Sequence, residues 1–502
     1  MTVRSLVWFR GKELRVADHA PLDSAARAGE VIPVFVLDPY FFDPVRAREL
    51  PHRMQFLLES LACLQQDLTR LGSTLLVVAG KSTEVIPRMA EQWHVDRVVC
   101  QRWTEPFARE RDRRVASALR MPLELLGGET LLAPERLRTG KGAPYTVFTH
   151  FARALFAKSD EIGEPLPAPR RLPPLPADVS APLAAPIPSL RELGILNNPR
   201  LAHGGEAAAS ARLRAFMGGP FSTYAHDRDF PALAGTSSLS ADLKFGTISP
   251  RTVWQAARRG GAFERASRSR DVFCNQLVWR EFAHSTLWDR PEILTAPFRR
   301  EFSGFPYRDD DDGWRAWTEG TTGYPIVDAA ARQLYAEGLV HNRARMIAAS
   351  FLARHLMIDF RRGEAHYMKY LVDGDWANND LGWQWSAGCG CDAQPYFRVF
   401  NPTLQGERFD PDGVYVKRWV PELGRMPADY VHRPWEAPTD VLQQAGVVLG
   451  RTYPTPCVEH RFARARFLRT ARQHIHAAQS RGESARPHAA LTNIGHDPNR
   501  SS

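Results

Sequence analysis

Five short runs of apolar and β-branched residues alternate with helical segments in the first 126 residues. The intervening segments, such as HRMQFLLESLACLQQDL (52–68), repeat apolar residues with the period of an amphipathic helix. Strands and helices that alternate in this way build βαβ units on a parallel, doubly wound sheet. No G-x-G-x-x-G sequence follows any of these runs, so the fingerprint of a dinucleotide-binding site is absent. The predicted strands are SLVWF (5–9), VIPVFVL (31–37), TLLVV (74–78), DRVVC (96–100) and PLELL (122–126).

The pattern changes at a proline-rich stretch between residues 163 and 189. Proline sustains neither a helix interior nor a central strand, so this stretch is expected to connect two domains. Beyond about residue 190 helical periodicity dominates, as in VDAAARQLYAEGL (327–339). We therefore expect an α/β, Rossmann-like domain followed by an all-α domain. The expected boundaries are 1–135 for the α/β domain, 136–200 for the connector, 201–475 for the helical domain and 476–502 for a disordered tail.

Charge and cysteine content limit the partners and the compartment. The net charge of +9 and the pI near 9.4 favour a polyanionic partner such as nucleic acid. Six irregularly spaced cysteines suit neither a disulfide framework nor a zinc or iron–sulfur site, so we expect free thiols in the cytoplasm and no metal. The chain starts without a signal-peptide pattern, and no run approaches 18 apolar residues, so no role in a membrane is expected.

GTSSLSADLKFGTISPR (235–251) contains two hydroxyl-rich turns. The backbone N–H groups and the hydroxyls of Thr236, Ser237, Ser238 and Ser240 could hold a pyrophosphate. The alternative is that these hydroxyls only cap helices, as they commonly do.

Two helical motifs combine polar and apolar groups on one face. NQLVWREF (275–282) brings an amide, an indole and a guanidinium within two turns, and HNRARMIAASFL (341–352) places three residues at i, i+3 and i+4. Both patterns suit the wall of a binding site, although a core tryptophan, a solvated arginine and a core methionine would also explain them. The residues are Gln276, Trp279 and Arg280 in the first motif and Asn342, Arg345 and Met346 in the second.

DGDWANNDLGWQW (373–385) is the most unusual stretch. A solvated turn would explain Asp373 and Asp375, but it does not explain Trp383 and Trp385 beside them. The carboxylates could pair with Arg345, and burying such a pair is costly unless it positions a ligand.

These motifs, together with TTGYPIVDAAARQL (321–334) and PYFRVFNPTLQGERFDP (395–411), resemble the photolyase/cryptochrome family in content and order over residues 3 to about 470. The resemblance is closest to bacterial class I cyclobutane pyrimidine dimer photolyases. It implies an N-terminal α/β antenna domain and a C-terminal helical domain that holds FAD. It also implies DNA that contains pyrimidine dimers as the partner, and we expect a monomer.

The resemblance further implies roles for individual residues. Hydroxyls and amides suit the FAD diphosphate, and a neutral amide at Asn379 suits flavin N5. A base flipped out of DNA needs aromatic walls and amides. The implied FAD contacts are Tyr224, Thr236, Ser237, Ser238, Leu239, Ser240, Arg280, Arg345, Asp373, Gly374, Asp375 and Asn379. The implied catalytic pocket comprises Gln276, Trp279, Asn342, Met346, Asn379 and Trp385, and the implied DNA contacts are Gln276, Trp279, Asn342, Arg343 and Gln405.

The implied reaction is light-driven electron transfer from reduced FAD to a flipped dimer. It needs no general acid or base, whereas (6-4) photoproduct repair needs proton transfer. Relatives that repair (6-4) photoproducts carry histidines where Asn342 and Met346 stand here, which favours the cyclobutane dimer. Dimer-specific relatives carry glutamate at Gln276, whose amide can still bind a thymine edge. The alternatives are a (6-4) photolyase and a cryptochrome photoreceptor without repair activity.

Two further features depart from the family pattern. Of the three tryptophans that usually carry electrons to the flavin only Trp383 is present, with Phe360 and Tyr307 at the other two positions. The usual route is therefore expected to be broken, or rerouted through Trp376, Trp317 or a tyrosine. Asp38 and Arg53 are candidate antenna contacts, although a structural cap or a surface charge explains them equally well. A deazaflavin or flavin antenna, or no antenna, is favoured over folate, because Phe107 or Ala108 replaces the expected acidic residue.

Overall fold

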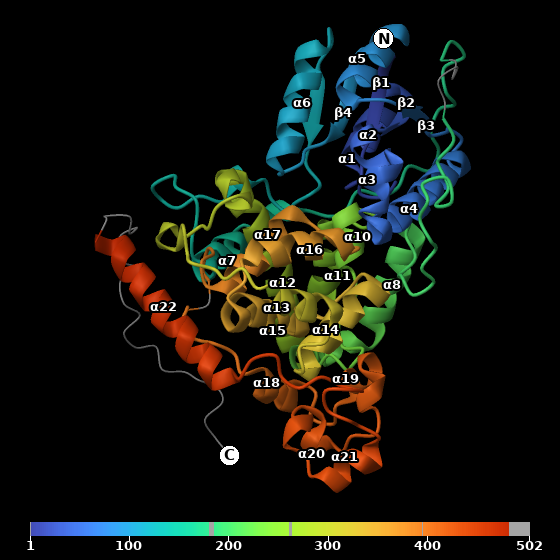
Figure 1. Cartoon of the computed structure of the whole chain (residues 1–502). Coiled ribbons are helices and arrows are strands. Elements are labelled where there is room, and N and C mark those ends of the chain that lie inside the picture. The colour runs from blue at the N-terminus through green and yellow to red at the C-terminus, as the bar shows by residue number, and fades with distance from the viewer. Residues whose placement is uncertain (1, 180–184, 261–263, 394, 481–502) are drawn as a thin grey trace.

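The computed structural model describes residues 2–179, 185–260, 264–393 and 395–480. Within these ranges the N-terminal part forms a five-stranded sheet in the order β3-β2-β1-β4-β5, with every neighbouring pair parallel (Figure 1). The chain builds outward from β1 to one edge and then to the other, which confirms the predicted doubly wound sheet. The strands are β1 (Val3–Phe9), β2 (Gly29–Leu37), β3 (Leu76–Ala79), β4 (Arg97–Gln101) and β5 (Leu123–Leu126).

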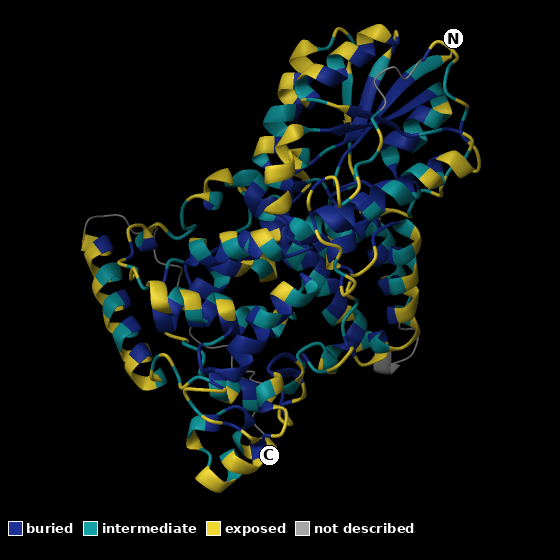
Figure 2. Cartoon of the chain, turned by 45° about the vertical axis from the view of Figure 1, so that its right-hand side comes forward, coloured by how far each residue is buried: buried dark blue, intermediate teal, exposed yellow. Residues whose placement is uncertain are grey.

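Helices cover both faces of this sheet. Val7 and Phe9 of β1 pack toward α1 (Ala20–Ala28) and α4 (Pro51–Arg70), while Leu6 and Trp8 pack toward α5 (Ser82–Gln92) and α6 (Pro106–Ala118). Because alternate residues enter two cores, the strands read as almost continuous apolar runs. Figure 2 shows the buried strands between helices with exposed outer faces. Two short helices, α2 (Pro39–Phe42) and α3 (Pro44–Arg48), precede α4.

The remaining described residues are predominantly helical and bury two apolar cores. One core lies among α7, α8, α11 and α12, and the other among α14, α15, α16, α19 and α22. No helix in the described ranges is both long and apolar enough to cross a bilayer. The helices are α7 (Phe148–Ala157), α8 (Glu206–Gly218), α9 (Tyr224–Asp227), α10 (Ser240–Phe245), α11 (Pro250–Arg259), α12 (Glu264–Asp289), α13 (Asp311–Glu319), α14 (Pro325–Glu337), α15 (Asn342–Ser350), α16 (Phe360–Tyr370), α17 (Trp376–Ala387), α18 (Pro402–Phe409), α19 (Val414–Trp419), α20 (Ala428–Val431), α21 (Thr439–Ala445) and α22 (His460–Ser480).

Helix α10 docks the helical part onto the sheet. Phe245 stacks on Phe56 of α4 with the ring centroids 4.9 Å apart, and it enters the core of the α/β part. Gly246 follows in the left-handed region at φ 64°, where a Cβ would lie 2.0 Å from the carbonyl oxygen of Lys12. Only glycine fits so close to the other backbone, so this position fixes how the two parts meet.

Three expectations from the sequence differ from the structure. The connector 136–200 contains α7, whose Phe151 and Leu155 are buried in the helical core; its proline-rich part, by contrast, has no helix within 164–179. Helix α22 continues to Ser480, so residues 476–480 of the expected disordered tail are helical, and 481–502 lie outside the described residues. The helical motif at 341–352 does not end as a regular α-helix, because it widens into a π-helix at Phe351–Leu356, where Arg354 and His355 are fully buried.

Candidate functional site at the domain junction

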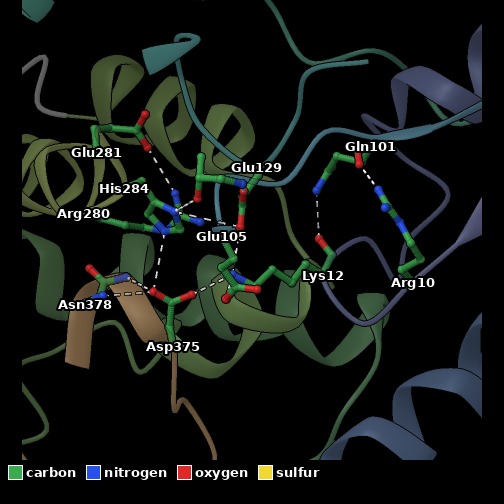
Figure 3. A network of polar contacts seen from close by, with 11 residues as sticks. Arg10, Lys12, Gln101, Glu105, Glu129, Arg280, Glu281, His284, Asp375 and Asn378 are labelled. Atoms are coloured by element: carbon green, nitrogen blue, oxygen red, sulfur yellow. Dashed lines mark hydrogen bonds and ion pairs between the residues drawn. The ribbon is translucent and has the colours of Figure 1, made fainter. Parts of the chain in front are cut away.

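A buried cluster of charges joins the two parts of the protein at Lys12 (Figure 3). The Lys12 ammonium lies 2.6 Å from Glu105, 2.8 Å from Glu129 and 2.8 Å from Asp375. All four side chains are at most 6% exposed. Lys12 and the two glutamates belong to the α/β part, whereas Asp375 begins α17 of the helical part. One ammonium therefore contacts three buried carboxyl groups across the junction, and burial together with the charges of Asp375 and Glu129 raises the pKa of Glu105.

The charge states of this cluster follow from burial and from these contacts. Burial alone would lower the pKa of Lys12, but Asp375, Glu105 and Glu129 raise it well above its ordinary value. In return Lys12 holds the pKa of Asp375 well below the usual range despite burial. Asp375 also accepts hydrogen bonds from the backbone N–H of Asn378 at 3.0 Å and from its amide at 2.8 Å. The carboxylate of Asp375 is thus ionised, and it caps α17 through its bonds with Asn378.

Two residues of α12 complete the polar cluster. Burial and the nearby Arg280 lower the pKa of His284 to about 4, so its ring is neutral at pH 7 although Asp375 lies 3.7 Å away. His284 Nδ1 lies 2.7 Å from the hydroxyl of Thr104 in the α/β part. Arg280 pairs with Glu281 at 3.1 Å and is about one tenth exposed. The guanidinium of Arg280 is thus held beside Asp375 and His284.

A second ion pair lies on the other side of the Asp373–Asp375 loop. Arg345 Nη2 donates to Asp373 Oδ2 at 2.8 Å. The other oxygen, Asp373 Oδ1, is buried and has no hydrogen-bond partner in the part of the chain that the structure describes. A buried acceptor without a hydrogen-bond donor lowers the free energy of unfolding. The pair therefore has the chemistry to receive an N–H donor from a ligand.

Asn379 lies one turn into α17 and is half-buried. Its amide nitrogen donates to the carbonyl oxygen of Glu364 at 3.1 Å. With that nitrogen engaged, the amide oxygen of Asn379 is the atom that it can offer to a ligand.

The hydroxyl-rich segment around the start of α10 carries four side-chain hydroxyls. Within the described residues the side chains of Thr236, Ser237, Ser238 and Ser240 donate no hydrogen bond to other groups. Ser238 has a positive φ of 52°, and Leu239 anchors the segment in the apolar core. Tyr224 lies in the same core.

A chain of polar contacts joins the predicted pocket residues of α12 and α15. Arg228 donates to the amide oxygen of Gln276 at 3.2 Å and approaches Asp229 to 3.9 Å. Asp229 in turn pairs with Arg343 at 2.8 Å. On α15 the amide of Asn342 contacts the sulfur of Met346 at 3.6 Å. These contacts bring Gln276 and Arg343 to one neighbourhood.

The aromatic pocket candidates have different surroundings. Trp279 stacks in parallel on Phe148, with the ring centroids 3.7 Å apart and 2° between the planes. Phe148 therefore covers one face of this indole, a contact that the sequence did not indicate. Trp385 and Gln405 are half-buried, and no ring contact joins Trp385 to Trp279 within the described ranges.

The antenna candidates lie on the α/β side. Asp38 accepts hydrogen bonds from Tyr40 N at 3.1 Å and from Ser82 N at 2.9 Å, so it acts as a structural cap. Arg53 donates to the carbonyl of Met368, while its Nε is buried without a partner in the described part of the chain. Lys244 of α10 has no hydrogen bond or ion pair with the described residues. Burial and the cations Arg53 and Lys12 lower the pKa of Lys244 well below its ordinary value.

Sequence reasoning missed Lys12, Glu105, Glu129, His284 and Lys244. Their motifs are short and ordinary, and their partners lie up to 363 residues away. The position of Lys12 directly after a buried strand was the only local signal, because the carboxyl ends of parallel strands are where sites form.

Replacing Lys12 by methionine is expected to lower the free energy of unfolding by about 3–5 kcal/mol, because three buried carboxylates lose their counter-ion. Urea unfolding followed by circular dichroism measures this. Lys81→Met is the matched control, since Lys81 is 68% exposed and lies 3.7 Å from Glu84; a change below about 0.5 kcal/mol is expected. Equal effects of the two substitutions would contradict the role of the cluster.

Two buried acids behind Asn379 predict a pH-dependent stability. Burial raises the pKa of Asp380 to about 7, and burial with the charge of Asp380 raises that of Glu364 to about 8. The folded protein therefore holds protons that the unfolded chain has released, so stability falls as pH rises from about 4 to 8.

Asp380→Asn is expected to remove part of this loss, on the order of 4 kcal/mol. Comparing the free energy of unfolding at pH 5 and pH 8.5 tests it. Asp312→Asn, at a side chain that is 94% exposed, should leave the pH profile unchanged. A profile for Asp380→Asn that equals the wild-type profile would refute the prediction.

Comparison with known families agrees with this geometry. Residues 5–170 match the family described as DNA photolyase, and residues 273–473 match the one described as the FAD binding domain of DNA photolyase. The second range includes Arg280, Arg345, Asp373 and Asn379.

Whole-chain relatives extend the match. Deoxyribodipyrimidine photo-lyase of Agrobacterium fabrum is 40% identical over 484 residues, covering 93% of this chain and 97% of that one. The enzyme of the same name from Escherichia coli is 38% identical, with coverage of 92% and 97%.

Solved structures are similar as well. A class III photolyase from Agrobacterium tumefaciens has a TM-score of 0.88 and 40% identity, covering 95% of this chain and 98% of its own. A cryptochrome from Synechocystis has a TM-score of 0.84 and 31% identity, with coverage of 93% and 100%. An archaeal photolyase from Sulfolobus tokodaii with two FAD molecules has a TM-score of 0.76 and 27% identity. The match covers 94% of this chain and 100% of the archaeal one. These matches do not show whether the chain is closer to class I, as expected from the sequence, or to another photolyase class. The chain belongs to the DNA photolyase family.

Proposed function

We propose that this protein uses FAD and blue light to split cyclobutane pyrimidine dimers in DNA. The observation that carries the proposal is the similarity, over more than nine tenths of both chains, to enzymes named deoxyribodipyrimidine photo-lyase. The net charge of +9 suits a polyanionic substrate.

FAD would bind at the Arg345–Asp373 pair and beside Asn379. A flavin ring presents N–H donors and carbonyl acceptors, and the pair offers a buried unpartnered oxygen beside a guanidinium. The amide oxygen of Asn379 could accept from a flavin N–H. The unengaged hydroxyls before α10 suit the diphosphate. The remaining proposed contacts are Tyr224, Leu239, Arg280, Gly374 and Asp375.

The lesion would enter beside α12 and α15. A flipped dimer needs aromatic and apolar walls with amides for its base edges. Because Phe148 covers one face of Trp279, only the opposite face can stack on a base. The proposed pocket is Gln276, Trp279, Asn342, Met346 and Trp385, with Arg343 and Gln405 on the DNA backbone.

Bound FAD, in its reduced form, supplies the light-driven electron that opens the cyclobutane ring. The side chains of the pocket position the dimer and transfer no proton. Burial lowers the pKa of His341, the histidine beside Asn342, to about 4, so it is neutral at pH 7. This supports the cyclobutane dimer over the (6-4) photoproduct, whose repair needs a proton donor.

The alternative is a cryptochrome-type photoreceptor. The similarity to the Synechocystis cryptochrome favours it, as does Gln276 at a position where dimer-specific relatives carry glutamate. Repair measurements separate the two.

Chemically reduced protein is expected to restore thymine absorbance in an oligonucleotide with one thymine dimer, under blue light and not in the dark. An oligonucleotide with one (6-4) photoproduct is the matched control and should stay unrepaired. Failure of dimer repair with reduced flavin bound would overturn the proposal.

Trp279→Ala should weaken binding of the damaged strand about 5- to 150-fold, because a stacked base contributes about 1–3 kcal/mol.

We also propose a second chromophore of the deazaflavin or flavin type beside Arg53 and Lys244. Lys244 has no hydrogen bond or ion pair with the described residues, and Arg53 Nε lacks an acceptor there. A ring system with acceptor atoms could accept hydrogen bonds from both groups. The archaeal relative with two FAD molecules supports a flavin in this role.

We propose that the protein works as a cytoplasmic monomer, since its six cysteines are free thiols and one chain supplies the whole site.

Lys244→Met is expected to weaken binding of an added deazaflavin or flavin mononucleotide at least tenfold while FAD content stays unchanged. Fluorescence titration of the holoprotein measures this. Lys81→Met should bind as the wild type does. Equal affinity of Lys244→Met and wild type, or preferential binding of folate, would reject this site.

A further inference from the structure

We propose that helix α22 binds the backbone of the duplex that flanks the lesion, as a second DNA contact outside the lesion pocket. This second contact rests on the proposed function, since it requires DNA as the substrate. Helix α22 (His460–Ser480) contains five arginines and no acidic residue. Figure 1 shows it along an outer edge of the helical part, away from the sheet.

Helix α22 has an apolar inner face and a cationic outer face. Phe467 and Ala471 are buried in the helical core. Arg466 turns inward and donates to the carbonyl oxygen of His355 at 2.5 Å. The other four arginines are exposed and occupy less than half of the helix circumference, because each residue turns the helix by about 100°. They are Arg461, Arg464, Arg469 and Arg472.

The four exposed arginines form no ion pair with the described residues. Like charges three positions apart repel each other, and the helix dipole disfavours a cation such as Arg461 in the first turn. Exposed arginines elsewhere are paired, since Arg113 and Arg114 both lie 2.8 Å from Glu110. An external polyanion would relieve the repulsion on α22. The outer face therefore has the charge of a surface that binds one.

The spacing of these arginines suits a nucleic-acid backbone. At a rise of about 1.5 Å per residue, Arg461 and Arg472 lie about 16 Å apart along the helix. One strand of B-DNA carries a phosphate about every 3.4 Å of its axis, so this length corresponds to about five phosphates. A guanidinium binds phosphate oxygens in bidentate fashion. The outer face can thus contact several phosphates of one strand, which a single small anion would not require.

The position of α22 places this face beside the proposed lesion pocket. The buried guanidinium of Arg354 lies 5.8 Å from the ring of Phe467 on α22. The same guanidinium donates to the carbonyl oxygen of Tyr396 at 3.3 Å. Tyr396 belongs to the segment between α17 and α18, the helices of Trp385 and Gln405. One buried side chain therefore connects α22 with the segment that joins two proposed DNA contacts.

The two contacts differ in what they recognise. Phosphate contacts position DNA without reading its bases, so α22 would hold damaged and undamaged duplexes alike. Such contacts release counter-ions and weaken as the salt concentration rises. The lesion pocket instead binds a flipped dimer through stacking and amides. A short damaged strand therefore engages the pocket alone, whereas a long duplex engages both contacts.

The test replaces Arg464, Arg469 and Arg472 together by glutamine in the full-length protein with FAD bound. The three side chains are exposed and glutamine is a good helix former, so the fold is retained, which circular dichroism checks. Fluorescence anisotropy measures the affinity for a long duplex with one central thymine dimer. The affinity at low salt should fall about tenfold or more, and the slope of its logarithm against that of the salt concentration should fall by about 2–3, because three phosphate contacts are lost.

The matched control replaces three exposed arginines of the α/β part that each pair with an acid of their own helix. It changes the net charge by the same amount, and it should bind the duplex as the wild type does. A short single-stranded oligonucleotide with one thymine dimer should bind equally to all three proteins. The control substitutions are Arg27→Gln, Arg113→Gln and Arg114→Gln.

Wild-type duplex affinity and salt dependence in the α22 variant would overturn the proposal. So would an equal loss in the control variant, which would be an effect of net charge alone, or a loss of the short oligonucleotide from the α22 variant. Unchanged duplex affinity with weaker binding of polyglutamate would assign the face to an acidic protein instead. Repair of the short oligonucleotide by chemically reduced wild-type protein tests the proposed function separately, because that strand does not reach α22.

Discussion

The ammonium of Lys12 holds the site together. It contacts Glu105, Glu129 and Asp375 where water is excluded, and Asp375 in turn caps α17. Burying these acids without the cation would be costly, and so would burying the cation alone. The start of α17 sets the directions of Asn379 and Trp383, so the position of the proposed flavin contacts depends on a residue of the other domain. Gly246, pressed against the Lys12 carbonyl, fixes the same junction through the backbone.

The fold was largely predictable because its signals are local. Residues 31–37 are apolar throughout, and a strand buried on both faces is what they form. The proposed pocket residues were also visible, since Asn342 and Met346 share a face by helical spacing alone. The ion cluster was not predictable, because nothing near Lys12 in the sequence indicates Asp375. Helix α7 was missed because neighbouring prolines masked a segment that packs on α12.

Two buried acids lie behind Asn379 on adjoining helices. Glu364 belongs to α16 and Asp380 to α17, and burial raises the pKa of Glu364 to about 8 and that of Asp380 to about 7. Because water is excluded from both carboxyl groups, the neutral form of each is favoured more strongly than in water.

The order of the cluster along the chain matters during synthesis. Lys12, Glu105 and Glu129 belong to the first 129 residues, while Asp375 follows 246 residues after Glu129. At about 5–20 residues per second, the ribosome needs roughly 12–50 seconds to add that stretch. Throughout this interval the nascent sheet domain has the lysine and two of its three carboxylate partners. The ammonium is thus in place before the aspartate that links it to the helical part has been synthesised.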